Sequence, residues 1–275
     1  MSDQMNMLGI QRYLKSVGYY TGKLDGDAGR QTWQAVLDLL EVRRNELTNR
    51  PREWGRARRL VAVQQLFCKD KGYDPGPVDG YWGPSTAEAM DMALGKVDAG
   101  WRDKIKEPSA AEKAALTRRV GTTWPRQRDM IKFYGQPGQN QAIIQLPTSM
   151  RIAWNLRQKA TRISCHEKVA DPMLRIITNT IDHYGEDQWR KLGLDLYGGC
   201  LNVRKMRGGS AWSMHSWGIA MDIDPANNRL RWNKSKARLA RPEYEPFWKI
   251  VEGEGAISLG RIRDFDWMHF QFARL

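Results

Sequence analysis

The first 95 residues contain an internal repeat with an offset of 54 positions, and this repeat constrains the fold more than any other feature. The recurring positions are Gln11 and Gln65, Gly18-Tyr19 and Gly72-Tyr73, Gly22 and Gly76, Asp25-Gly26 and Asp79-Gly80, Gly29 and Gly83, Thr32 and Thr86, and Ala35 and Ala89. Apolar residues recur at helical spacing before Gly18, which stands where a glycine commonly ends a helix. Asp-Gly is a turn dipeptide, and a second apolar helical pattern follows it in each copy. Each copy is therefore predicted to form a helix, a glycine-rich turn and a second helix.

The turn of the second copy carries two aromatic residues that the first copy lacks. Tyr81 and Trp82 follow Asp79-Gly80, whereas Asp27-Ala28 stands at the same place in the first copy. The recurring Gly-Tyr, Asp-Gly, Gly and Thr positions resemble the peptidoglycan-binding domain of wall hydrolases. This resemblance implies wall binding, and aromatic faces suit the apolar faces of sugars. The expected wall-binding residues are Asp79, Gly80, Tyr81 and Trp82. In the alternative interpretation, both copies are small helical bundles with only a packing role.

A second informative stretch runs from Ser213 to Asp224 and places carboxylates in an apolar run. If residues 219–224 form a strand, Ala220, Asp222 and Asp224 point to one face, and Ile219, Met221 and Ile223 point to the other. A buried carboxylate is costly unless it is paired, hydrogen-bonded or bound to a metal. Gly218 gives the chain the freedom for a turn that brings His215 over the carboxylate face. A histidine and an aspartate that converge in this way indicate a metal site.

The C-terminal stretch Asp264–Phe272 completes this group of residues. Met268, Phe270 and Phe272 alternate with His269 and Gln271, which predicts a half-buried strand. His215, Asp222 and His269 would supply three N and O ligands and leave a fourth position to water, as in a catalytic zinc site. Asp266 lies three residues before His269, close enough to act as a base without being a ligand.

The motif Ser-x-His-x-x-Gly-x-Ala-x-Asp, followed by Asp-x-x-His, resembles the LAS-type zinc peptidases. The resemblance covers roughly residues 150–275 and is to the D-alanyl-D-alanine carboxypeptidase branch, which includes many bacteriophage endolysins. It implies one Zn²⁺ per chain held by His215, Asp222 and His269, with Asp266 as the general base. It also implies an upstream basic residue that faces the scissile carbonyl, for which Arg204 fits better and Arg207 is the alternative. Ser213, Arg207 and Trp267 are the expected substrate-binding residues. The bond cut is either L-alanyl–D-glutamate or D-alanyl–D-amino acid.

The net charge of +13 indicates an anionic partner, such as nucleic acid, a membrane surface or the bacterial envelope. Nucleic acid is the disfavoured partner, because Lys and Arg are spread along the chain and are not interleaved with aromatics in a run. No apolar stretch is long enough for stable membrane insertion, and the N-terminus lacks a secretory signal pattern. The three cysteines fit no metal-binding spacing, which favours reduced thiols of a protein made in a cytoplasm. We expect a monomer made in a host cytoplasm that acts on peptidoglycan after release.

These features predict a multidomain chain with N-terminal all-α repeats and a C-terminal α+β zinc peptidase domain built on a small antiparallel sheet. The expected segments are repeat 1 at 1–48, repeat 2 at 55–97, a charged helical linker at 98–132 and the catalytic domain at 133–275. Two other functions remain as alternatives. One is a wall-binding protein with a structural zinc and no catalysis. The other is a glycosidase in which Asp222 and Asp266 are the carboxylate pair.

Overall fold

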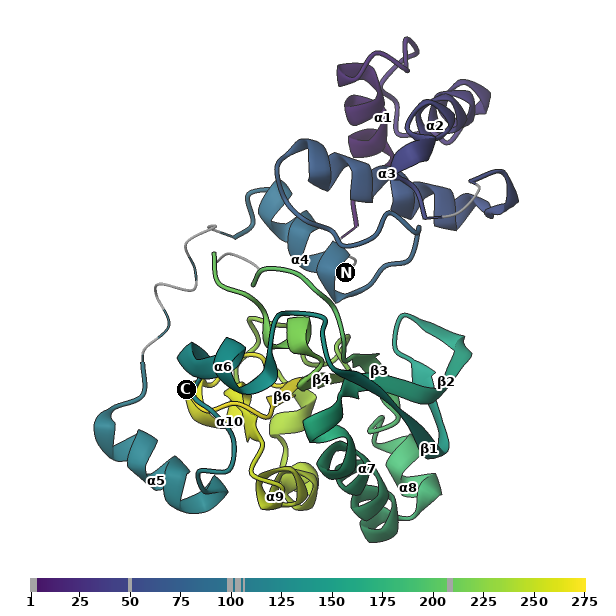
Figure 1. Ribbon diagram of the computed structural model, residues 1–275. Helices are drawn as coiled ribbons and strands as arrows, with labels where there is room; N and C mark the ends of the chain where they lie inside the picture. The colour runs from purple at the N-terminus through teal and green to yellow at the C-terminus, as the bar shows by residue number, and fades with distance from the viewer. Residues whose placement is uncertain (1–3, 49–50, 98–100, 102–104, 106, 207–209) are drawn as a thin grey trace. The chain divides into compact units, whose positions relative to one another are not determined.

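The chain forms two units, Met1–Trp101 and Arg102–Leu275 (Figure 1). The computed structural model describes residues 4–48, 51–97, 101, 105, 107–206 and 210–275. Below, the first unit is called the helical unit and the second the sheet domain. No helix among the described residues is long and apolar enough to cross a membrane.

The helical unit is built from two helical hairpins. Its α-helices are α1 (Met7–Ser16), α2 (Arg30–Val42), α3 (Arg56–Asp70) and α4 (Pro84–Ala93), with short 3₁₀ turns η1 (Arg44–Glu46) and η2 (Pro51–Glu53) between the hairpins. The two hairpins share one apolar core, whose members include Leu14, Val36, Leu40, Val63 and Leu66. Because α3 contacts α1, α2 and α4, the two copies pack together as one body.

The same hydrogen-bond network closes the turn of each hairpin, at the sequence offset of 54. Gln11 Nε2 donates to Asp25 Oδ1, the Asp27 carbonyl and Thr32 Oγ1, and its Oε1 accepts from Gly26 N. The matching bonds of Gln65 are to Asp79, the Tyr81 carbonyl, Thr86 and Gly80. We call each set a glutamine network. Gly80 has φ +73°, and a Cβ there would lie 2.5 Å from the Arg58 carbonyl oxygen, so the turn requires glycine.

The sheet domain is organised around a six-stranded sheet of order β2-β1-β3-β4-β6-β5. The strands are β1 (Gln141–Ile152), β2 (Asn155–His166), β3 (Leu196–Gly199), β4 (Ala220–Ile223), β5 (Ile257–Ser258) and β6 (His269–Gln271). The expected antiparallel sheet is mixed instead, because β1 and β3 pair in parallel. A long connection through β2 and two helices separates these strands, and such a crossover returns the chain in the same direction.

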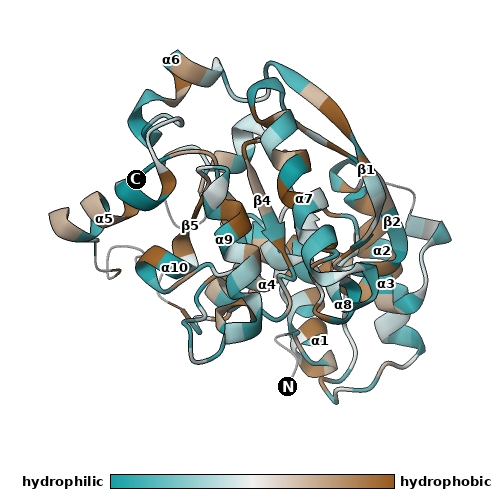
Figure 2. Ribbon diagram, turned by 90° about the horizontal axis from the view of Figure 1, so that it is seen from below, coloured by the Kyte–Doolittle hydropathy of each residue, from teal (hydrophilic) through white to brown (hydrophobic). Residues whose placement is uncertain are grey.

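The helices of the sheet domain enclose its apolar core. They are α5 (Ala110–Val120), α6 (Met130–Tyr134), α7 (Ala170–Tyr184), α8 (Glu186–Lys191), α9 (Glu245–Gly253) and α10 (Leu259–Arg263). Short 3₁₀ turns also occur at η4 (Gln127–Asp129), η5 (Glu167–Val169), η6 (Met214–Trp217), η7 (Arg238–Ala240) and η8 (Pro242–Tyr244). Helix α7 contacts β1 and α9, and Trp189, Trp248, Phe270 and Phe272 are fully buried in the shared core. Apolar colour runs along much of β4 in Figure 2, since this strand is buried on both faces and contributes Ala220, Met221 and Ile223 to the core.

The described part of segment 98–132 is not the solvated linker that its charges suggested. Helix α5 begins at a capping box formed by Ser109 and Glu112, as its sequence predicted. Its Leu116 and Val120 are buried with Ile257 of β5. Further along, Trp124 donates Nε1–H to the Glu254 carbonyl at 2.9 Å, inside the main core. Residues 107–132 therefore belong to the sheet domain, because one apolar face of α5 outweighs the charges on the other.

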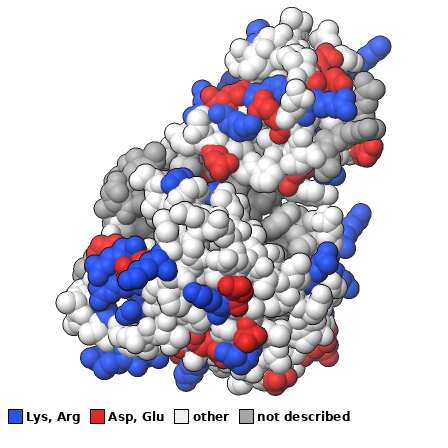
Figure 3. Space-filling view, in the orientation of Figure 1, with Lys and Arg blue, Asp and Glu red and all other residues white. Residues whose placement is uncertain are grey.

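Charged side chains on the sheet domain are unevenly distributed on the face shown in Figure 3. Basic side chains gather over α5, which carries Lys113, Arg118 and Arg119. One of them is anchored, since Arg119 Nε lies 2.9 Å from the buried Glu252 carboxylate. The position of this basic surface is consistent with the expectation of an anionic partner.

Candidate metal centre

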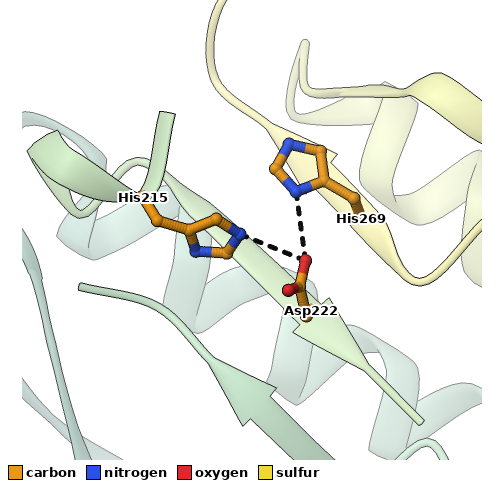
Figure 4. Close-up of side chains that lie close together, drawn as sticks. All are labelled: His215, Asp222 and His269. Carbon is orange, nitrogen blue, oxygen red and sulfur yellow. Dashed lines mark hydrogen bonds and ion pairs between the residues drawn. The ribbon is translucent and has the colours of Figure 1, made fainter. Parts of the chain in front are cut away.

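Three side chains from separate elements meet at one end of the sheet (Figure 4). His215 lies in η6, Asp222 in β4 and His269 at the start of β6, and the β4–β6 register pairs Asp222 directly with His269. Asp222 Oδ1 lies 3.2 Å from His215 Nε2 and 3.0 Å from His269 Nδ1. Each residue offers one ligand atom, and these three atoms lie within 4.8 Å of one another. The structure thus brings together the three residues that the sequence named as metal ligands.

Gly218 makes the approach of His215 to the strand feasible. It follows η6 with φ +67°, in the left-handed region, and its N–H donates to the His215 carbonyl. A Cβ at this position would lie 3.0 Å from the His166 amide nitrogen of β2. The turn therefore needs a residue without a side chain, as the Gly in the motif suggested.

The two imidazole rings are held by hydrogen bonds on the sides that face away from Asp222. His215 Nδ1 lies 2.7 Å from the Cys200 carbonyl, and His269 Nε2 lies 3.0 Å from Gln271 Oε1. Both partners are oxygens that accept, so the proton of each neutral ring sits on the nitrogen that faces the oxygen. His215 Nε2 and His269 Nδ1, which face Asp222, are then the nitrogens that can give a lone pair to a cation when one displaces their hydrogen bonds to the carboxylate. Three electron-pair donors of N and O type fit a divalent cation such as zinc.

The electrostatics of this cluster favour an ionised carboxylate between the two rings. Burial acts to raise the pKa of Asp222, but His215 and His269 together hold that pKa well below its ordinary value. Burial lowers the pKa of His269, but the Asp222 hydrogen bond and the Asp266 charge leave it raised overall. Asp222 is only 7% exposed, so the site combines an anionic oxygen with a largely dehydrated environment.

The ligand cluster lines a pocket of about 220 Å³ that also receives Arg204, Ser213 and Asp266. Arg204 is fixed through its backbone, since its N–H donates to Ser216 Oγ at 3.0 Å and its carbonyl accepts from Ser213 N at 3.0 Å. The Arg204 guanidinium donates to the Lys205 carbonyl at 3.1 Å. The structure thus places all three residues in the lining of the same pocket as the cluster.

Asp266 reaches the pocket from a strained piece of backbone. Its φ is +57°, a conformation that Asp tolerates better than most residues. The Asp266 N–H donates to the Leu230 carbonyl at 2.8 Å, and its own carbonyl accepts from His269 N at 3.1 Å. The first bond ties Asp266 to the segment that contains Leu230, and the second ties it to the strand that begins with His269. Backbone strain of this kind often accompanies functional sites.

Two residues that were expected to bind substrate, Trp267 and Arg207, are not placed at this pocket by the structure. Trp267 turns into the apolar core, where its ring packs at 6.4 Å from that of Trp248 and its Nε1 donates to Asp264 Oδ1. Trp267 lines a neighbouring pocket with Lys234 and Arg261 and is not brought to the pocket of the histidines. Arg207 lies outside the described residues.

The four residues expected to bind the wall lie in the turn between α3 and α4. Asp79 and Gly80 are partners of Gln65 in its glutamine network, so both have a structural role. The aromatics are half-buried, although exposed rings were expected. The guanidinium of Arg58 stacks over the Tyr81 ring at 4.4 Å, and Trp82 packs against the cluster of Cys68, Ala89 and Met90. Aromatic residues in a turn need not have solvent-exposed rings, because neighbouring side chains can cover the ring faces that a sugar would contact.

Sequence reasoning missed the hydrogen-bond partners of the two histidines. The Cys200 carbonyl is main chain and leaves no signature in a sequence. Gln271 does leave one, because it stands two residues after His269 on the same face of a predicted strand.

Residues 207–272 match the model of a family described as D-alanyl-D-alanine carboxypeptidase. This segment contains His215, Asp222, Asp266 and His269, which are the residues that meet in the structure. The match supports a metallopeptidase of this type in this part of the chain. No curated protein and no solved structure matches the chain.

Proposed function

We propose that this protein is a zinc peptidase that hydrolyses the stem peptide of bacterial peptidoglycan. The observation that carries the proposal is the convergence of His215 Nε2, Asp222 Oδ1 and His269 Nδ1 in a pocket, within the segment that matches the carboxypeptidase family. The arrangement has three protein ligands and an accessible side, which is the form of catalytic zinc sites.

Each pocket residue has a role that follows from its chemistry. A zinc ion bound here would polarise a carbonyl group and lower the pKa of a water molecule. Asp266 accepts the proton of the attacking water and returns it to the leaving amine. Arg204 donates hydrogen bonds to the oxygen on which negative charge develops. Ser213 holds the backbone of Arg204 and so keeps that donor at the pocket.

Digestion of purified peptidoglycan tests the proposal directly. New amino termini among the released fragments are expected, and mass analysis of those fragments would separate L-alanyl–D-glutamate cleavage from D-alanyl–D-amino acid cleavage. New reducing sugars would instead indicate a glycosidase. That alternative is weakened because Asp222 already engages both histidines. If the protein bound peptidoglycan without releasing any fragment, catalysis would be excluded and a wall-binding protein would remain.

We also propose that the helical unit holds the enzyme at the wall, as in a bacteriophage endolysin released from the host cytoplasm. The paired hairpins with their glutamine networks and the family resemblance of the repeat support this role. A fragment of residues 1–101 should co-sediment with purified sacculi. Trp82→Ala should reduce the amount of fragment in the pellet more than Ala28→Gly does. Binding of this fragment that survives only at low salt would instead indicate a non-specific electrostatic contact.

A further inference from the structure

Gln271 lies against the His269 ring on the side away from Asp222. Both residues belong to β6, and their spacing of two places them on one face of the strand. Gln271 is 1% exposed, its Oε1 lies 3.0 Å from His269 Nε2, and its Nε2 donates to the Ala273 carbonyl at 2.9 Å. The side-chain amide is therefore held at both ends.

The direction of this amide follows from its second partner. A main-chain carbonyl can only accept, so the NH₂ group of Gln271 must face Ala273 and the oxygen must face His269. The oxygen in turn requires an N–H on His269 Nε2, so Nδ1 is the nitrogen left to donate a lone pair to a bound cation. Nδ1 is the atom that faces Asp222 and the proposed metal position.

We propose that Gln271 is a positioning residue that sets the tautomer of His269 and thereby raises the affinity of the site for zinc. The inference rests on the metal site of the proposed function but not on the reaction. His215 has a similar partner in the Cys200 carbonyl, which side-chain substitution does not remove. In the described part of the site, Gln271 thus offers a way to test tautomer control by mutation.

The test compares Gln271→Leu with Gln271→Glu in the full chain. Leu removes the acceptor and keeps an apolar group of similar size, so the zinc dissociation constant should rise roughly 10–100-fold. Glu retains an oxygen that accepts from His269 Nε2, so its dissociation constant should stay closer to that of the unmodified protein. Competition with a chelator at fixed pH measures all three constants. Thr180→Val is the matched control, because it removes a buried hydrogen bond to the Ile176 carbonyl elsewhere in the domain.

A second readout examines the His269 ring with zinc bound. In ¹⁵N NMR of the zinc-loaded protein, His269 Nε2 should carry a proton that exchanges slowly with solvent, and Gln271→Leu should speed that exchange. Circular dichroism confirms that each variant is folded before it is compared. Unchanged zinc affinity in Gln271→Leu would overturn the inference, and so would equal losses in the Leu and Glu variants, which would indicate packing alone. If zinc affinity depends on Gln271 as expected but the protein cuts no peptidoglycan, this inference is supported and only the proposed function is overturned.

Discussion

The helical unit and the sheet domain bury polar side chains in opposite arrangements. In the helical unit, the Gln65 amide donates and accepts within its own turn, so its polar groups are matched by their neighbours. In the sheet domain, His215, Asp222 and His269 each direct an electron-pair donor toward a common point. The first arrangement is complete and fixes a shape. The second would gain stability from a bound cation, and this difference distinguishes a polar cluster that fixes a shape from one that is arranged to bind a ligand.

The strongest way to break this comparison is to remove a ligand. His215→Ala and His269→Ala should each reduce zinc from about one ion per chain to a small fraction of that, and peptidase activity should fall with it. Atomic absorption on the dialysed protein measures the metal. His183→Ala is the control, because His183 lies exposed at the end of α7. Normal zinc content in both ligand variants would disprove the site.

Asp266→Asn separates the base from the ligands. The amide cannot take a proton from water, so kcat should fall roughly 10²–10⁴-fold while zinc content stays near that of the unmodified protein. Asp264→Asn, at the other left-handed aspartate of this turn, should have a much smaller effect on kcat. Release of peptides from peptidoglycan gives the rates. Turnover equal to that of the unmodified protein would assign the base to another residue.

A glutamine network should be costly to open but irrelevant to zinc. Gln65→Leu leaves the Gly80 N–H without its acceptor, and a buried group left unsatisfied costs about 1–3 kcal/mol. Urea unfolding of the helical unit should show a loss in this range, with unchanged zinc content. Gln34→Leu replaces an exposed glutamine of α2 and should stay within about 0.5 kcal/mol. Equal losses in the two variants would mean that the network contributes little.

The smallest expected effect concerns surface charge in the helical unit. Hydrogen bonds from Arg43, with help from Lys69, lower the pKa of Glu46 from 4.5 to about 2. Because this pKa is lowered on folding, the stabilisation is present above about pH 4.5 and is lost as the pH falls toward 2. The pair is partly exposed, so Glu46→Gln should cost at most about 1 kcal/mol at pH 7. Urea midpoints across this pH range should converge at the acid end; a constant difference would contradict the linkage.

The features that sequence predicted well are those with a local period. The offset of 54 predicted two matching hairpins, and the structure repeats their hydrogen bonds at the same offset. Likewise, strand alternation placed Asp222 and His269 on polar faces, and the observed register brings them side by side. Local patterns are reliable here because each turn or strand pair is determined by residues close in sequence or in direct register.

The features that sequence reasoning missed depend on distant packing or on backbone conformation. The β1–β2 hairpin carries little alternation, because much of β2 is exposed, and Pro147 lies where the register shifts between Gln145 and Met150. Trp267 was expected at the substrate pocket. Left-handed residues at Asp264 and Asp266 turn the chain there, so the indole enters the core against Gly260.

The glutamine networks also affect how the two hairpins can diverge. Each network closes over 21 residues of its own copy, from Gln11 to Thr32 and from Gln65 to Thr86. A duplicated segment with this property keeps the glutamine network of its turn, because the network's hydrogen bonds join residues of the same copy. Turn positions such as the exposed Ala28 and the half-buried Trp82 can then differ while both turns keep the same hydrogen bonds. The duplication therefore supplies two turns whose side chains can change separately.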